Sequence, residues 1–153
     1  PRASNSKNRY GIGLNQFENF LNPLLDNYIK PIAEYIFEDV DAKFQNRYYF
    51  TARYSPNMDL KLKKHKDDSD ITLNVCLGSV FTGSKLYFKG VMETKLNKVP
   101  KTFQSLQEQE HEMDHDIGQG VIHHGHHIHG ARPITSGERI NLIVWLRAQP
   151  YHM

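Results

Sequence analysis

The hydrophobic pattern of the chain changes near residue 47, and this change constrains the fold more than any other feature. Before it, apolar side chains recur at steps of three and four residues from Leu14 to Phe37, a spacing typical of amphipathic helix. Pro23 and Pro31 should break this helix into pieces or lie in first turns. After it, short runs rich in Tyr, Phe, Val, Ile and Thr predict strands. The predicted strands are residues 47–54, 70–78, 85–90, 118–125 and 139–147.

Short strands with no helix between them favour a sandwich or jelly roll over a parallel α/β sheet. We therefore predict a mainly β fold, a jelly roll with flanking helices and an N-terminal helical segment. All 153 residues are expected to form one domain, with a polar leader at 1–13, helices at 14–40 and a jelly-roll core at 47–148. Residues 95–116 are polar and weakly periodic, which indicates an exposed loop or a short helix followed by a loop. Because the chain starts at Pro1, we expect it to be part of a longer protein.

Charge and composition exclude several classes of protein. The formal net charge is +2, and the one dense basic cluster, residues 61–66, runs straight into Asp67 and Asp68, so no nucleic-acid partner is expected. No apolar run approaches the roughly 20 residues of a membrane-spanning helix, so no membrane segment is expected. The single cysteine, Cys76, excludes an intrachain disulfide and leaves the compartment open, although we favour a soluble, intracellular protein.

Two candidate metal ligands stand in the sequence His65-Lys66-Asp67, just before a predicted strand. Alternate positions of an extended chain direct His65 and Asp67 to the same side. Together with a distant histidine they could form a facial triad, which suits iron(II) because three coordination positions remain free. Zinc, by contrast, prefers four ligands and does no redox chemistry. The alternative is that both residues are exposed turn residues beside the lysines.

A distant histidine is available in the segment HHGHHIHG at residues 123–130. By itself, such a cluster is more typical of adventitious metal affinity or of a solvated loop. A zinc hydrolase or a structural zinc protein built on this cluster would require His124, His126 or His127. It could dispense with the His-x-Asp pair.

Two predicted strands carry polar side chains on one face. In the strand that follows the His-x-Asp pair, Thr72, Asn74 and Cys76 share a face that could line a wet cavity or face solvent. In the last strand, Arg139 and Trp145 share a face, and a charged residue in a mostly buried strand needs an anionic partner. A dicarboxylate cosubstrate could supply that partner, since arginine grips carboxylates in a bidentate manner. A structural Asp or Glu is the alternative.

Four segments of the sequence, taken in order, carry a likeness to a known family. They are RYSPNMDLKLKKHKD, TLNVCLG, FTGSKLYF and GQGVIHHGHHIHGARPITSGERINLIVWLR. Their combination, which spans nearly the whole chain, resembles the prolyl- and lysyl-hydroxylase branch of the iron(II)/2-oxoglutarate oxygenases. The resemblance implies a double-stranded β-helix with flanking helices, in agreement with the jelly roll predicted from the pattern of strands.

The resemblance implies a role for three candidate ligands and for a basic anchor. His65 and Asp67 match the His-x-Asp pair of the family. His129 matches its distal histidine, because Arg139 follows it by ten positions, as the basic anchor does in the family. The three ligands would hold iron(II), with no catalytic residue expected beyond them, and Arg139 would anchor the cosubstrate 2-oxoglutarate.

Three further pocket residues and the reaction follow from the same resemblance. Tyr54 would help to bind the distal carboxylate of 2-oxoglutarate, while Asn74 and Trp145 would line the pocket. The implied reaction hydroxylates a protein or peptide side chain, prolyl or lysyl, and converts 2-oxoglutarate and dioxygen into succinate and carbon dioxide. Ascorbate is a candidate reductant. A nucleic-acid demethylase of this superfamily would carry a second arginine six positions after the first, where this chain has Trp145.

The chain departs from the family pattern in two places. Ser84 replaces a second glycine in the FTGS segment, a change expected to alter a turn without touching a ligand. The histidine-rich insertion around His126 could bind stray nickel or zinc. We assign no role to His123, and we expect His124, His126 and His127 to be exposed.

The sequence leaves one rival function open. A non-catalytic jelly-roll module could retain the same pocket in order to bind a carboxylate ligand or a partner protein. The substrate and the oligomeric state are not determined by the sequence.

Overall fold

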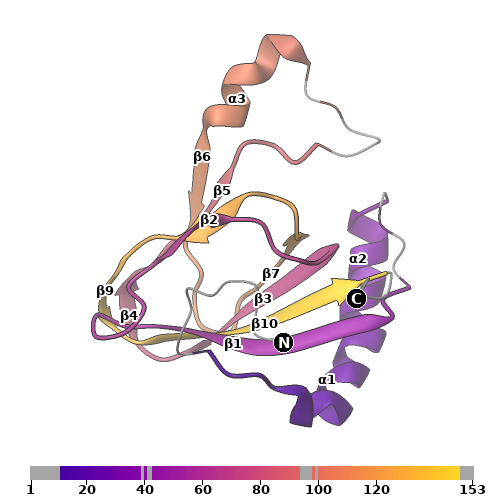
Figure 1. Cartoon of the computed structure of the whole chain (residues 1–153), viewed down its shortest axis with the longest axis vertical. Coiled ribbons are helices and arrows are strands. Elements are labelled where there is room, and N and C mark those ends of the chain that lie inside the picture. The colour runs from indigo at the N-terminus through magenta and orange to yellow at the C-terminus, as the bar shows by residue number, and fades with distance from the viewer. Residues whose placement is uncertain (1–10, 39, 41–42, 94–97, 99, 149–153) are drawn as a thin grey trace.

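The computed structural model describes residues 11–38, 40, 43–93, 98 and 100–148, and it consists of two β-sheets with helices outside one of them (Figure 1). The predicted jelly-roll fold, mainly β with an N-terminal helical segment, is confirmed. Residues 1–10 of the predicted polar leader lie outside the described residues. The strands are β1 (Asn46–Tyr54), β2 (Leu62–His65), β3 (Ile71–Gly78), β4 (Phe81–Gly83), β5 (Leu86–Lys89), β6 (Glu110–Met113), β7 (Gly120–His124), β8 (His129–Ala131), β9 (Ile134–Gly137) and β10 (Arg139–Arg147).

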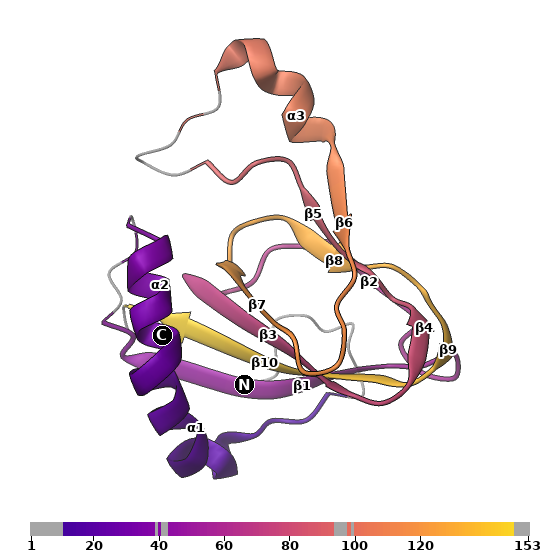
Figure 2. The same cartoon turned by 180° about the vertical axis from the view of Figure 1, so that it is seen from behind.

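The strands form two four-stranded antiparallel sheets and a separate pair. The first sheet has the order β1-β10-β3-β7 and the second the order β2-β8-β5-β6, while β4 pairs with β9. Strands that neighbour one another in a sheet are often far apart in sequence. β1, at the edge of the first sheet, pairs with β10 along nine residues. Figure 2 shows the two sheets from behind, with β7 and β8 leading from one sheet to the other.

The helical segment covers the outer face of the first sheet (Figure 1). It runs through a 3-10 turn (Asn15–Phe17), α1 (Glu18–Leu24), a π-helical turn (Leu25–Ile29) and α2 (Lys30–Ile36). Pro23 lies inside α1 and Pro31 in the first turn of α2, so the two prolines flank the wide turn, in line with the predicted break into pieces. The helix ends at Ile36, four residues before the predicted end, because Phe37 leaves the helical conformation.

Two hydrophobic clusters lie on opposite faces of the first sheet. The outer cluster joins Leu21, Leu25 and Ala33 of the helical segment to β-strand residues such as Ile71 and Leu73. The inner cluster fills the space between the two sheets and consists of Ala52, Tyr54, Leu86, Ala131, Ile134, Ile143 and Trp145. The two faces of β3 and β10 are therefore oriented as predicted. Thr72, Asn74 and Cys76 of β3 and Arg139 of β10 lie on the inner face.

All five predicted strands are present, but the structure contains short strands that the pattern did not indicate. β2, β4, β6, β8 and β9 have three or four residues each, too few for a period of two to be recognised. β6 lies within the segment predicted as loop or short helix, after the 3-10 turn Lys101–Phe103 and α3 (Gln104–Glu108). This excursion projects from the end of the second sheet (Figure 1).

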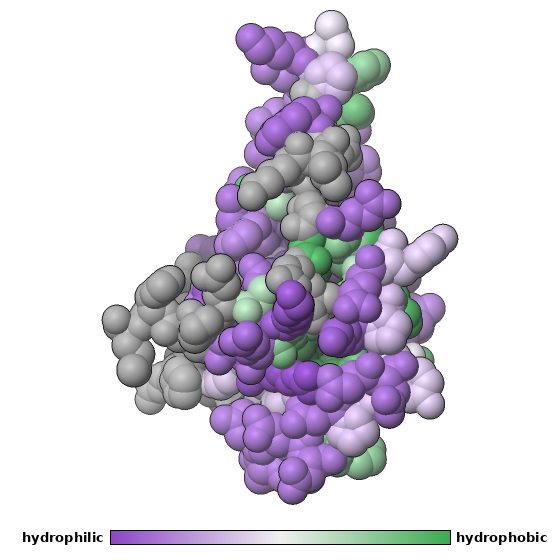
Figure 3. Space-filling model, turned by 90° about the vertical axis from the view of Figure 1, so that its right-hand side faces the viewer, coloured by the Kyte–Doolittle hydropathy of each residue, from purple (hydrophilic) through white to green (hydrophobic). Residues whose placement is uncertain are grey.

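The outer surface is dominated by hydrophilic side chains on the side of the molecule that carries α2, where hydrophobic residues show only in small patches (Figure 3). Within the described residues, no helix combines the length and the apolar character needed to cross a lipid bilayer.

Candidate metal centre

Three side chains converge at one end of the space between the sheets. His65 is the last residue of β2, and it pairs across the ladder with His129, the first residue of β8. Asp67 follows two residues after His65. The His65 Nε2 atom lies 3.2 Å from Asp67 Oδ1, and the His129 Nε2 atom lies 3.5 Å from Asp67 Oδ2. One ligand atom from each residue lies within 4.8 Å of the other two, a spacing at which all three could bind a single ion.

Hydrogen bonds to the backbone fix the ring orientation of both histidines. The Nδ1 atom of His65 is 2.8 Å from the carbonyl oxygen of Lys63, and the Nδ1 atom of His129 is 2.7 Å from that of His127. Because a carbonyl only accepts, each Nδ1 carries a proton, and in the neutral ring Nε2 then keeps the lone pair. Both lone pairs therefore face Asp67, the arrangement that a metal-binding histidine requires.

Asp67 is held as a carboxylate by its neighbours. The Thr72 hydroxyl donates to Asp67 Oδ2 at 2.7 Å, and Ser69 Oγ lies 2.8 Å from the Thr72 hydroxyl. Burial would raise the pKa of Asp67, but the contact with His65, the neighbouring ring of His129 and the Thr72 hydrogen bond together lower it. Burial also lowers the pKa of His129, which favours the neutral ring that a metal needs.

Gly125 allows the histidine-rich segment to lie against the turn that carries Asp67. The Asp67 amide donates to the Gly125 carbonyl at 2.7 Å, and the Gly125 amide donates to the Asp70 carbonyl at 3.0 Å. A Cβ atom at position 125 would lie 2.1 Å from the carbonyl oxygen of Ser69, so only glycine fits this contact. The segment is thus anchored beside the three ligands rather than free in solvent.

The remaining histidines of the segment differ from the expectation of uniform exposure. His126 is exposed, but His124 and His127 are half-buried, which corrects the prediction for these two. The His124 ring packs against Phe37 with centroids 4.6 Å apart, and His127 Nε2 contacts the carbonyl oxygens of residues 89 and 90. His123 is buried, and its ring lies 4.4 Å from that of His129.

The histidine-rich segment makes no metal cluster of its own in the described part of the chain. There, His65, Asp67 and His129 are the one group of three or more potential ligands close enough to share an ion. Burial, followed by the neighbouring His129, lowers the pKa of His123 to about 3, so His123 stays neutral beside the centre. A zinc protein built on this segment finds no support in the geometry.

Arg139 lies fully buried at the other end of the inner face and has no carboxylate partner among the described residues. Its Nε donates to Asn141 Oδ1 at 3.0 Å, its Nη1 donates to the carbonyl oxygen and the hydroxyl of Ser84, and its Nη2 donates to His115 Nδ1 at 2.5 Å. Burial lowers the pKa of Arg139, while Tyr54 and Cys76 oppose that effect. A buried cation held only by neutral acceptors fits an incoming anion.

The other predicted pocket residues lie on the same inner face. Tyr54 pairs with Arg139 across the β1–β10 ladder. Asn74 accepts a hydrogen bond of 2.7 Å from Asn141, which links β3 to the Arg139 network. Trp145 is buried, and its Nε1 is the buried side-chain nitrogen or oxygen that lacks a hydrogen-bond partner within the described residues. Trp145 pairs with Thr72, which contacts Asp67, so the inner face of β10 extends from Arg139 to the neighbourhood of the metal ligands.

Sequence reasoning assigned no role at the site to five residues that support it. Thr72 and Asn141 had a signal, because each is a polar residue on the inner face of a mostly apolar strand. Ser84, buried and with a φ of 55°, contacts Arg139 directly and thus does more than alter a turn. His115 and Gly125 had no signal, since their contacts come from loops that only the folded chain brings to the site.

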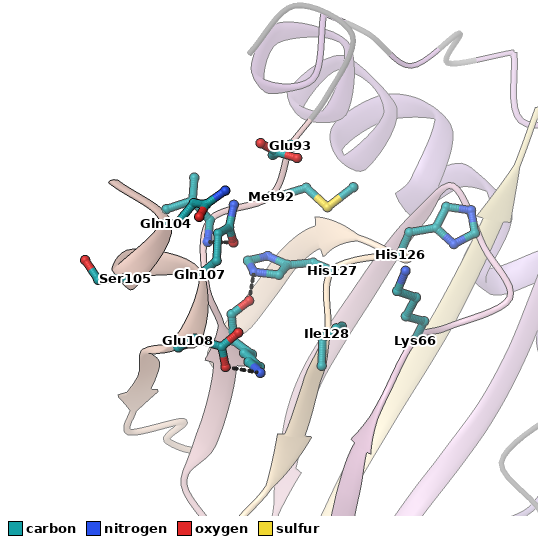
Figure 4. A pocket seen from close by; sticks show the side chains of 12 residues that line it. Lys66, Met92, Glu93, Gln104, Ser105, Gln107, Glu108, His126, His127 and Ile128 are labelled. Atoms are coloured by element: carbon teal, nitrogen blue, oxygen red, sulfur yellow. Dashed lines mark hydrogen bonds and ion pairs between the residues drawn. The ribbon is translucent and has the colours of Figure 1, made fainter. Parts of the chain in front are cut away.

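A hollow of about 790 Å³, lined mainly by residues with polar side chains, opens beside the metal ligands (Figure 4). Lys66, which stands between His65 and Asp67, lines it from one side, and Ile128, which precedes His129, lines its floor. The end of β5 and the segment from β5 to α3 supply the opposite wall. The side chains from that wall are Lys89, Val91, Met92, Glu93, Gln104, Ser105, Gln107 and Glu108, with His126 and His127 completing the lining.

Comparison with curated proteins finds several relatives along almost the whole chain. It is 37% identical over 148 residues to the human 2-oxoglutarate and iron-dependent oxygenase domain-containing protein 2, which covers 94% of this chain and 40% of the relative. It is 36% identical over 151 residues to the Arabidopsis thaliana 2-oxoglutarate and iron-dependent oxygenase domain-containing protein CP2, covering 96% of this chain and 37% of the relative. The chain therefore spans about two fifths of the length of these relatives. No family model matches it.

Comparison with solved structures finds the same fold in two further proteins. An oxidoreductase of the 2OG-Fe(II) oxygenase family from Burkholderia pseudomallei superposes with a TM-score of 0.64 at 16% identity, covering 86% of this chain and 56% of that protein. A viral collagen prolyl hydroxylase from Paramecium bursaria Chlorella virus-1 superposes with a TM-score of 0.60 at 17% identity, covering 92% and 79%. At these identities the likeness concerns the fold alone.

Proposed function

We propose that the chain is a 2-oxoglutarate and iron-dependent oxygenase domain, as its similarity to relatives of that name supports. It would hydroxylate a protein side chain, prolyl or lysyl, while 2-oxoglutarate and dioxygen become succinate and carbon dioxide. The observation that carries this proposal is the convergence of two Nε2 lone pairs and one carboxylate within 4.8 Å. Iron(II), when bound, would supply the activation of dioxygen that no side chain can perform. His65, Asp67 and His129 would hold it.

The donor set fits such an ion. Two imidazoles and one carboxylate on one side of an octahedral ion leave positions for an oxo acid and for dioxygen. Both histidines already present the correct nitrogen, and Thr72 orients the carboxylate of Asp67. The chain therefore needs no change of tautomer in order to bind the metal.

Arg139 would bind the distal carboxylate of 2-oxoglutarate at the far end of the inner face. Arginine suits this task because its planar guanidinium offers several parallel donors. Tyr54 would contribute a hydroxyl from the neighbouring strand, while Asn74 and Trp145 would line the space between carboxylate and metal. The absence of a carboxylate beside Arg139 in the described residues supports this assignment.

The hollow beside the ligands would receive the protein substrate. Its lining carries amide, ammonium and carboxylate groups, which can hydrogen-bond to a peptide backbone, and it borders both ligand-bearing segments through Lys66 and Ile128 (Figure 4). An open hollow lined mainly by polar residues suits a protein substrate better than it suits a small apolar ligand. Ascorbate would serve as an external reductant.

Succinate formation tests the proposal. Protein loaded with iron(II) under anaerobic conditions is mixed with 2-oxoglutarate, and succinate is measured after air is admitted, for the wild type, His129→Ala and Arg139→Ala. We expect slow turnover by the wild type even without a protein substrate, and its loss in both variants. A wild type that binds neither iron(II) nor 2-oxoglutarate would instead favour a non-catalytic binding module.

A further inference from the structure

His115 occupies a position that no motif assigned to it. It lies in the loop between β6 and β7, is 3% exposed, and places Nδ1 2.5 Å from Arg139 Nη2. Its other ring nitrogen, Nε2, lies 2.9 Å from the carbonyl oxygen of Gln119. Both ring nitrogens are therefore engaged inside the protein, so the ring has one fixed orientation.

The chemistry of the two partners fixes the state of the His115 ring. A guanidinium has only donors, so Nδ1 must accept, and a carbonyl only accepts, so Nε2 must donate. The ring is therefore neutral, with its proton on Nε2. Burial and then the charge of Arg139 lower the pKa of His115, which agrees with this assignment from geometry.

The loop that carries His115 is fixed to β3 by backbone hydrogen bonds. The Cys76 amide donates to the Gln119 carbonyl at 3.0 Å, and the Gly118 amide donates to the Cys76 carbonyl at 2.8 Å. The Gln119 side chain accepts a further bond of 2.9 Å from the Asp116 amide, closing the turn. The ring is therefore a rigid support for Arg139 rather than a passing contact.

The contacts of Arg139 explain why this support matters. Four acceptor atoms surround its five N–H groups: one on Asn141, two on Ser84 and one on His115. Asn141 and Ser84 hold Nε and Nη1, while the ring of His115 contacts Nη2. Without it, rotation about the Cδ–Nε bond would be less restrained, and the Nη2 donors would lose their direction.

We propose that neutral His115 is a positioning residue that holds the Nη2 donors of Arg139 in the direction of the distal carboxylate of 2-oxoglutarate. This inference rests on the proposed function, because it concerns the same cosubstrate. A hydrogen bond to a charged group in a buried site corresponds to roughly a tenfold to hundredfold change in an equilibrium constant. Loss of the ring should therefore weaken the binding of 2-oxoglutarate by about tenfold or more.

Binding measurements on manganese(II)-loaded protein test the inference without turnover. Calorimetry gives the dissociation constants of 2-oxoglutarate and of 2-oxobutanoate, which has the same oxo-acid group but no second carboxylate. We expect His115→Ala to weaken 2-oxoglutarate binding about tenfold and to leave 2-oxobutanoate binding unchanged. His115→Asn, whose amide oxygen can replace Nδ1 as the acceptor, should restore most of the affinity.

A double-mutant cycle and a spectroscopic measurement complete the test. In an Arg139→Ala background, His115→Ala should cost no further affinity for 2-oxoglutarate, because its effect passes through Arg139. In the metal-free wild type, the 15N chemical shifts of the His115 ring should report a neutral ring protonated at Nε2.

Several outcomes would overturn the inference. They are an unchanged 2-oxoglutarate affinity in His115→Ala, an equal loss for both acids, an undiminished effect in the Arg139→Ala background, or a protonated Nδ1. A wild type that binds no 2-oxoglutarate would overturn the proposed function and the inference with it. The ring measurement on the metal-free protein separates these two failures, since it tests the His115–Arg139 contact alone.

Discussion

The hydroxyl of Thr72 donates a 2.7 Å hydrogen bond to Oδ2 of Asp67, and it is therefore a neighbour of the metal site that orients a ligand without being one. Because this hydroxyl gives its proton to Asp67, the hydroxyl of Ser69 at 2.8 Å must donate to Thr72. The two hydroxyls form a directed chain that ends on the carboxylate.

Thr72→Val should weaken metal binding by about tenfold to hundredfold, because it removes the donor while it keeps the shape of the side chain. Thr72→Ser retains the hydroxyl and is the matched control, for which we expect an affinity close to that of the wild type. Competition between a fluorescent chelator and the protein for manganese(II) measures both. Equal affinities for the valine and serine variants would show that the hydrogen bond does not orient Asp67.

Substitution of a metal ligand should abolish metal binding, whereas substitution of the exposed His126 should not. Asp67→Asn or His129→Ala removes one of three ligands, so we expect the stoichiometry of one metal ion per chain to fall to near zero at micromolar metal. His126→Ala, which alters an exposed residue of the same segment, should leave it unchanged. Metal analysis after gel filtration gives the stoichiometry. Loss of metal in His126→Ala would indicate that the histidine-rich segment binds the metal.

Gly125→Ala should disturb both folding and metal binding, because its Cβ would lie 2.1 Å from a backbone oxygen. We expect a loss of about 3 kcal/mol or more in the free energy of unfolding, as for other forced overlaps in packed sites. Gly13→Ala is the control, since its Cβ would meet nothing within 4 Å. Urea unfolding of both variants measures the difference, and a stable Gly125→Ala protein would contradict the close contact.

The sequence predicted the parts of the fold that depend on long periodic segments. Strands such as β3 and β10 have eight or nine residues, long enough for the two faces to differ, and Arg139 was recognisable as a charge within the second of them. Short strands and loop contacts were not predictable. His115 lies 24 positions from Arg139 in the chain, and their contact depends on how the loop before β7 meets β3.

The pKa of His115 predicts a pH dependence of stability. Burial, and then the charge of Arg139, lower this pKa below its ordinary value of 6.5, while Asp116 on the same loop opposes the shift. Between 6.5 and the lower pKa of the folded state, the unfolded chain binds more protons than the folded chain, so stability falls as the pH decreases through this window. Each pH unit of the window corresponds to at most about 1.4 kcal/mol.

His115→Asn removes this titrating group, so the difference between wild type and variant gives the contribution of His115 apart from that of the other histidines. Urea unfolding of the metal-free protein at pH 7.5 and pH 5.5 should show that the wild type loses more stability than the variant over this interval, by at most about 1.4 kcal/mol. Parallel losses in the two proteins would mean that His115 has the same pKa in the folded and unfolded chains.

Ser84 separates a backbone effect from a side-chain effect. Its φ of 55° lies in the left-handed region, where a side chain costs about 1 kcal/mol that glycine does not incur. Ser84→Gly and Ser84→Ala both lose the hydroxyl that accepts from Arg139 at 3.1 Å, and both keep the carbonyl oxygen that also accepts from it. Since the lost contact is common to both, we expect the glycine variant to be more stable than the alanine variant by about 1 kcal/mol in urea unfolding. An alanine variant as stable as the glycine variant would contradict this expectation. It would show that residue 84 leaves the left-handed region once the hydroxyl is gone, and therefore that the hydroxyl contact with Arg139 maintains this conformation.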